Sequence, residues 1–178
     1  MSIILASASP RRTEILELAH IKHIVIPSSC EEIIDETLTP AETVQSLAIQ
    51  KALDIYKQYP NDIVIGADTI VVKDNVIFGK PKDRAEAIKM LKSIQGDVHT
   101  VYTSLAILIE ERGEYKEFVE VVETDITVNP MTEAEIIEYV DTENPMDKAG
   151  AYAIQSTFAK FIDEIEGNYM SVIALPID

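Results

Sequence analysis

The sequence predicts a mixed α/β protein, because strand-like and helix-like stretches alternate along its 178 residues. Apolar stretches at 3–6 and 63–72 predict buried strands, and the second is apolar enough to be covered on both faces. Thr39, Asp83 and Thr132 each precede a glutamate by three residues, a capping pattern that predicts the start of a helix. The length and the 47% hydrophobic content suffice for one domain, and we expect residues 1–178 to form a single one.

The other elements follow from local patterns. In the first half of the chain, the sequence predicts a helix after Pro10, a strand at 23–26, a loop at 28–39 and a helix from 40 to about 56. After the central strand, it predicts a turn at 73–75, a strand at 76–78, a helix from Asp83 to about 93, and long strands at 99–109 and 114–128. The last part is predicted to form a helix after Thr132, an irregular stretch at 144–155, and a closing hairpin of 158–165 and 169–175.

The charge balance limits the classes of partner. The net charge is −16, so the chain repels nucleic-acid backbones and anionic membrane surfaces. A phosphate ligand therefore needs a local basic cluster, which favours a small phosphorylated molecule over a polymer. Cys30 is the single cysteine, which excludes an internal disulfide. The sequence shows no signal peptide and no long apolar span, so we expect a cytoplasmic location and no membrane partner.

The opening stretch is a candidate anion site. Ser9 is suited to be an N-cap and Pro10 to the first helical position, which places Arg11 and Arg12 in the first turn. The helix dipole already makes this end positive, and a bound phosphate would resolve the conflict. An ordinary helix start with solvated arginines is the alternative. Arg12 shares a helical face with apolar residues, which points it toward the core.

Asp68 interrupts the central apolar strand, and a buried carboxylate is costly unless it is paired or hydrogen-bonded. It is either a structural ion-pair partner or a catalytic or metal-binding aspartate. Lys51 lies on the apolar stripe of its helix and either extends to solvent or reaches into a site. Lys80 and Lys82 lie in a glycine–proline loop at a strand end, where they either bind a ligand or are solvated. The residues around them do not form a Walker motif.

With these stretches identified, the sequence resembles the Maf family of nucleoside triphosphate pyrophosphatases, also called septum formation inhibitor proteins. The matches span almost the whole chain, and their order and spacing make them specific together. They are 5–12 (Leu-Ala-Ser-Ala-Ser-Pro-Arg-Arg), 66–69 (Gly-Ala-Asp-Thr), 79–81 (Gly-Lys-Pro), 147–152 (Asp-Lys-Ala-Gly-Ala-Tyr), 154–155 (Ile-Gln) and 175–176 (Leu-Pro).

The resemblance implies an elongated mixed sheet flanked by helices, with a cleft between two lobes as in inosine triphosphatase-like folds. It implies hydrolysis of dTTP and UTP, or modified pyrimidine nucleotides, to the monophosphate and pyrophosphate with magnesium or manganese. Asp68 matches the catalytic acidic residue and Glu32 an acidic residue beside it, and both are candidate metal ligands. Residues that match nucleotide preference or the polar and basic lining of the site are Ser7, Arg11, Arg12, Lys51, Thr69, Lys80 and Gln155.

The chain departs from the family's pattern at three positions, and a second function is also compatible with its sequence. Ala153, Ser156 and Ala174 stand where the family usually has glycine, so rate or substrate choice could differ. The rival is a regulator of cell division or septum formation that senses nucleotides without turnover. The basic cluster fits both functions, and Asp68 favours the enzyme. The resemblance leaves a homodimer open.

Overall fold

The computed structural model describes residues 1–177, which divide into two compact units. Unit 1 comprises residues 1–68, 103–122 and the segment from Ala174 onward, and unit 2 comprises residues 69–102 and 123–173. Three long strands contribute residues to both units: β3 (Ile63–Lys73), β5 (Val98–Glu111) and β6 (Glu114–Val128). The prediction of a single domain stays a prediction.

The strands form a mixed sheet in the order β2-β1-β3-β5-β6-β7, with β4 paired to β3. β1 (Ile3–Leu5) lies parallel to both β2 (Ile24–Val25) and β3. β4 (Val76–Phe78) is antiparallel to β3, and β7 (Ile162–Glu166) is antiparallel to β6. The predicted fold class, a mixed α/β sheet flanked by helices, is confirmed.

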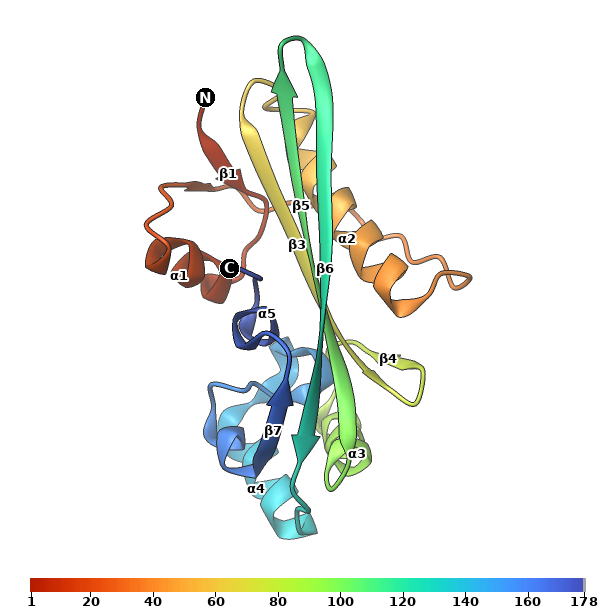
Figure 1. The fold of residues 1–178 in the computed structure, drawn as a ribbon. Coiled ribbons are helices and arrows are strands. Elements are labelled where there is room, and N and C mark those ends of the chain that lie inside the picture. The colour runs from red at the N-terminus through yellow and green to blue at the C-terminus, as the bar shows by residue number, and fades with distance from the viewer. Residues whose placement is uncertain (178) are drawn as a thin grey trace. The chain divides into compact units, whose positions relative to one another are not determined.

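Unit 1 contains α1 (Pro10–Leu18) and α2 (Pro40–Tyr56), and α2 runs alongside the strands of this unit (Figure 1). A cluster of buried side chains joins α2 to β1, β3 and β5: Ile4, Ala6, Ala48, Ala52, Ile55, Val64, Ala106 and Leu108. Alanines on the buried side of α2 allow its backbone to approach the sheet closely. This approach determines where the polar residues of α2 lie.

Unit 2 contains α3 (Arg84–Ile94), α4 (Glu133–Glu143), the 3-10 helices η1 (Pro145–Asp147), η2 (Ala149–Ala151) and η3 (Thr157–Phe161), and α5 (Tyr169–Ile173). Its core is rich in aromatic residues, with Phe158 fully buried against the rings of Tyr139, Tyr152 and Phe161.

Among residues 1–177, no helix has the length and apolar character needed to cross a bilayer.

The capping patterns were reliable predictors. Thr39 and Thr132 form complete capping boxes with the glutamates three residues later, and the Asp83 side chain accepts from the Glu86 N–H. The closing hairpin is wrong, because residues 157–161 form η3 and 169–173 form α5. Asn168 explains the error: its side chain accepts from the Ser171 N–H at 2.8 Å, which starts a helix where an apolar run suggested a strand.

Candidate active site

Arg12 is buried in unit 1, with an exposed fraction of 8%. Its guanidinium donates to the Ser7 hydroxyl at 2.8 Å and to the Ala174 carbonyl at 3.1 Å. The prediction that Arg12 faces the apolar side of its helix is confirmed, since Ile15 and Leu16 on that face are also buried. Burial lowers the pKa of Arg12, whereas the negative charges of Asp68 and Glu32 act to raise it.

The start of α1 places backbone donors beside this arginine. Ser9 is the N-cap and Pro10 the first helical residue, as predicted, but the Ser9 side chain makes no capping hydrogen bond within the described residues. Instead, the Ser7 hydroxyl accepts from the Ser9 N–H at 3.2 Å. The first turn has no acidic residue and includes the half-buried Arg11. The combination of a positive helix end and a buried guanidinium suits a bound anion.

Lys51 lies between two carboxylates. Its ammonium forms an ion pair with Glu32 at 2.9 Å and a hydrogen-bonded ion pair with Asp68. The Lys51 and Asp68 side chains are 16% and 13% exposed, whereas that of Glu32 is 47% exposed. Lys51 therefore does not simply extend to solvent, and Asp68 is ion-paired as its burial requires.

Gly66 explains how helix α2 brings Lys51 to Asp68. A Cβ atom at Gly66 would collide with the Ala48 carbonyl oxygen and lie 2.8 Å from the Ala52 nitrogen. Only glycine lets the α2 backbone come this close to β3, and Lys51 lies between the two alanines in sequence. The structural role of Gly66 is therefore to allow the close approach of helix α2.

Thr69, Lys80 and Gln155 lie in unit 2, as residues of β3, of the loop after β4 and of the turn between η2 and η3. Thr69 is half-buried, and the Lys80 and Gln155 side chains are exposed. Within this unit the Gly150 N–H donates to the Gly79 carbonyl at 3.1 Å, which joins the loop of Lys80 to the stretch that leads to Gln155. The residues of 79–81 and 147–152 are thus neighbours.

Ser156 has a structural role in unit 2. Its hydroxyl lies 2.9 Å from that of Tyr139, donates to the Ala153 carbonyl at 2.7 Å and accepts from the Phe158 N–H at 3.2 Å. The Tyr139 hydroxyl also accepts from the Ala153 N–H at 3.2 Å. These bonds hold the turn that bears Gln155 without using the Gln155 side chain.

Sequence analysis missed two polar arrangements. In unit 1, Gln50 and Asp54 hydrogen-bond to the loop before α2. In unit 2, the His99 Nε2 lies 2.6 Å from the Tyr152 hydroxyl inside the core. The four-residue spacing of Gln50 and Asp54 was the one available signal, since it puts both on one helical face. Nothing in the pattern linked His99 to Tyr152, which is 53 residues away.

These features define a mixed α/β protein with a cluster of paired charges suited to phosphate chemistry. A family model described as "Maf-like protein" matches residues 2–178. The chain belongs to this family.

The relatives include two proteins named dTTP/UTP pyrophosphatase that are each 47% identical to this chain. The first, from Bacillus cytotoxicus, aligns over 98% of this chain and 89% of its own length. The second, from Lachnoclostridium phytofermentans, has the same two coverages. Among solved structures, the Staphylococcus aureus Ham1 protein covers 71% of this chain and 72% of its own at 18% identity and a TM-score of 0.46, too slight a likeness to bear on function.

Proposed function

We propose that this protein hydrolyses dTTP and UTP to the monophosphate and pyrophosphate. The observation that carries the proposal is the cluster of unit 1, in which Lys51 pairs with Asp68 and Glu32 near the buried Arg12. The name of the relatives, which align over 98% of this chain, supports the choice of substrate. The acidic net charge supports a small phosphorylated ligand over a nucleic acid.

In the proposed reaction, a water oxygen attacks the α-phosphorus, and the bond from that phosphorus to the bridging oxygen of the β-phosphate breaks. Pyrophosphate leaves with that oxygen. Asp68 accepts the proton of the attacking water as a general base, or would instead hold a divalent cation beside that water. Arg12, Lys51 and the backbone N–H groups that begin α1 stabilise negative charge on the phosphates.

The residues of unit 1 fit a divalent cation such as magnesium or manganese. Glu32 and Asp68 supply carboxylate oxygens, the ligands that hard cations prefer, and both already contact one positive group, the Lys51 ammonium. No set of three His, Cys, Asp or Glu side chains within residues 1–177 could hold a metal by itself. The remaining ligands would be phosphates and waters, as is usual for magnesium. Such an ion would supply charge neutralisation and a more acidic bound water.

A second group of residues is proposed to contact the base and sugar of the nucleotide. We propose that Arg11, Thr69 and Gln155 set nucleotide preference and that Ser7 and Lys80 contribute polar and basic groups for substrate binding, as the family resemblance implies. Ser7 would act through Arg12, because its hydroxyl accepts a hydrogen bond from the Arg12 guanidinium. Substitution of Arg11, Thr69 or Gln155 should change the ranking of substrates more than the maximal rate.

The test is pyrophosphate release from a panel of nucleoside triphosphates with magnesium or manganese, for the wild type beside Asp68→Asn. We expect release from dTTP and UTP, and a loss of at least about a hundredfold in kcat for Asp68→Asn. Asp163→Asn is the matched control, because Asp163 is an exposed residue of β7. Near-full turnover by Asp68→Asn would overturn the role of Asp68. Nucleotide binding without release from any nucleotide would favour the sensor.

A further inference from the structure

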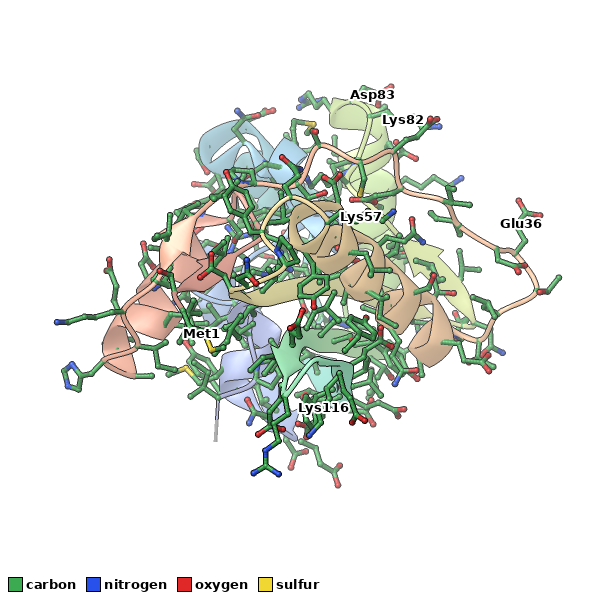
Figure 2. All side chains as sticks on the ribbon, turned by 90° about the horizontal axis from the view of Figure 1, so that it is seen from above. Met1, Glu36, Lys57, Lys82, Asp83 and Lys116 are labelled. Carbon is green, nitrogen blue, oxygen red and sulfur yellow. The ribbon has the colours of Figure 1, made fainter. Side chains whose placement is uncertain are left out.

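Glu32 lies in a segment without regular secondary structure. Residues 26–35 form no helix or strand, and Ile33 and Ile34 beside Glu32 are 72% and 58% exposed. Apolar burial therefore contributes little to holding this part of the loop. Glu36 lies further along the loop, at its outer bend, and its side chain points away from the protein (Figure 2). The position of Glu32 beside Lys51 must come from polar contacts.

Gln50 supplies two of these contacts through one side chain. Its amide oxygen accepts from the Ile33 N–H at 2.9 Å, and its amide nitrogen donates to the Ile33 carbonyl at 2.8 Å. The same nitrogen donates to the Ser46 hydroxyl at 3.0 Å, one helical turn away, which orients the amide. Gln50 thus pairs with the backbone of the residue that follows Glu32, much as a neighbouring strand would.

Asp54 holds the other end of the same segment. Its carboxylate accepts from the Ser28 hydroxyl at 2.7 Å and from the Ser29 N–H at 3.1 Å. Gln50 and Asp54 are four residues apart on α2 and face the loop together, whereas Lys51 follows Gln50 and pairs with Glu32. A single helix therefore carries both the cation that contacts Glu32 and the groups that fix the backbone beside it.

We infer that Gln50 is a positioning residue for the reaction and that it acts by fixing the backbone of Ile33, which places the Glu32 carboxylate. The inference rests on the proposed function and extends it to a residue that would touch neither substrate nor metal. Groups that orient a metal-binding side chain typically change metal affinity or activity by about 10- to 100-fold when they are removed. Glutamine is suited to this role because its amide both donates and accepts, as a peptide backbone pair requires.

The test compares Gln50→Ala with Gln45→Ala, a glutamine of the same helix that makes no hydrogen bond to the 28–33 segment among the residues that the structure describes. The first readout is amide hydrogen exchange of 28–36 in the protein without nucleotide or metal. We expect faster exchange in Gln50→Ala, an intermediate rate in Gln50→Glu, which can accept from Ile33 but not donate to it, and no change in Gln45→Ala. An unchanged rate in Gln50→Ala would overturn the inference.

The second readout is the affinity for Mn²⁺ alone, followed by electron paramagnetic resonance of the free ion. We expect about tenfold weaker binding in Gln50→Ala and no further weakening when the substitution is added to Glu32→Gln. Equal losses in the two backgrounds would show that Gln50 does not act through Glu32 and would overturn the inference.

The third readout is the rate of pyrophosphate release at subsaturating magnesium, which should fall about tenfold in Gln50→Ala and recover in part at high magnesium. A wild type without turnover would overturn the proposed function, whereas the exchange and Mn²⁺ measurements would still decide the role of Gln50. Thermal unfolding of each variant separates these effects from a loss of fold.

Discussion

The candidate site of unit 1 and the aromatic core of unit 2 hold different kinds of polar group. In the site of unit 1, three buried or half-buried groups are charged, and each has a partner: Arg12 binds Ser7 and Ala174, and Lys51 binds Asp68. In unit 2 the pair inside the aromatic core, His99 and Tyr152, is neutral, whereas the buried Lys73 of the same unit is ion-paired with Asp97. Burial lowers the pKa of His99 to about 4 and raises that of Tyr152, so both groups remain uncharged near pH 7.

This difference separates groups that have a proposed role in the reaction from a pair that belongs to the core. Ionised groups held partly away from water are costly, and in the candidate site of unit 1 the proposed reaction needs their charge. The neutral hydrogen bond between the His99 imidazole and the Tyr152 phenol avoids the cost of burying charge, although His99 Nδ1 has no hydrogen-bond partner among the described residues. Substitutions in the charged cluster should therefore change activity and, where they leave a charge unpaired, stability as well. Substitutions of the neutral pair should change stability and its dependence on pH.

The largest expected effect on stability comes from Lys51→Met. Its removal leaves Asp68, whose side chain is only 13% exposed, beside Glu32 without the cation between them. We expect a loss of about 3 kcal/mol in the free energy of unfolding, measured by urea denaturation. Adding Asp68→Asn should recover part of this loss, because the unpaired charge is then gone. A double variant less stable than Lys51→Met would contradict this account.

His99 should make stability depend on acid. Its side chain is 2% exposed, and burial is the main cause of its lowered pKa; Lys73 lowers that pKa further, whereas Asp125 and Asp97 oppose the shift. Between pH 6.5 and 4 the unfolded chain takes up a proton at His99 that the folded chain does not, so stability falls as pH falls. The loss is on the order of 3 kcal/mol at pH 4.

The measurement is urea denaturation at pH 7 and pH 4 for the wild type and His99→Gln. The variant removes the titrating ring, so the difference in stability between the two pH values should shrink by most of that amount. Carboxylates whose pKa is lowered also lose stability in acid, but they do so in both proteins. An identical pH dependence in both would show that His99 is not responsible.

The smallest expected effect comes from Gly66→Ala, which tests the close packing that brings Lys51 to Asp68. The added methyl would meet backbone atoms of Ala48 and Ala52, which cannot move aside as a flexible side chain could. We expect a loss of about 2 kcal/mol in thermal or urea unfolding. Gly79→Ala is the control, because no atom lies within 4 Å of the added methyl there. Equal stability of the two variants would contradict the packing argument.

Much of the fold could be predicted because its signals are local. The capping residues Thr39, Asp83 and Thr132 fix helix starts through bonds to groups three residues away. The long apolar stretch of β3 was likewise sufficient by itself to predict a buried strand. The closing segment was mispredicted because an apolar run fits a strand or a helix equally well, and the hydrogen bond from Ser171 to Asn168 decided between them.

The sequence by itself determined the alternation of strands and helices, the positive start of α1 and the isolation of Asp68 in an apolar strand. Only the tertiary structure decided that Lys51 pairs with both Asp68 and Glu32. It also decided that helix α2 packs against Gly66 and that Gln50 hydrogen-bonds to the backbone beside Glu32. The physical reason is distance along the chain. Caps and periodicity act within one or two helical turns, whereas these contacts join residues that only folding brings together.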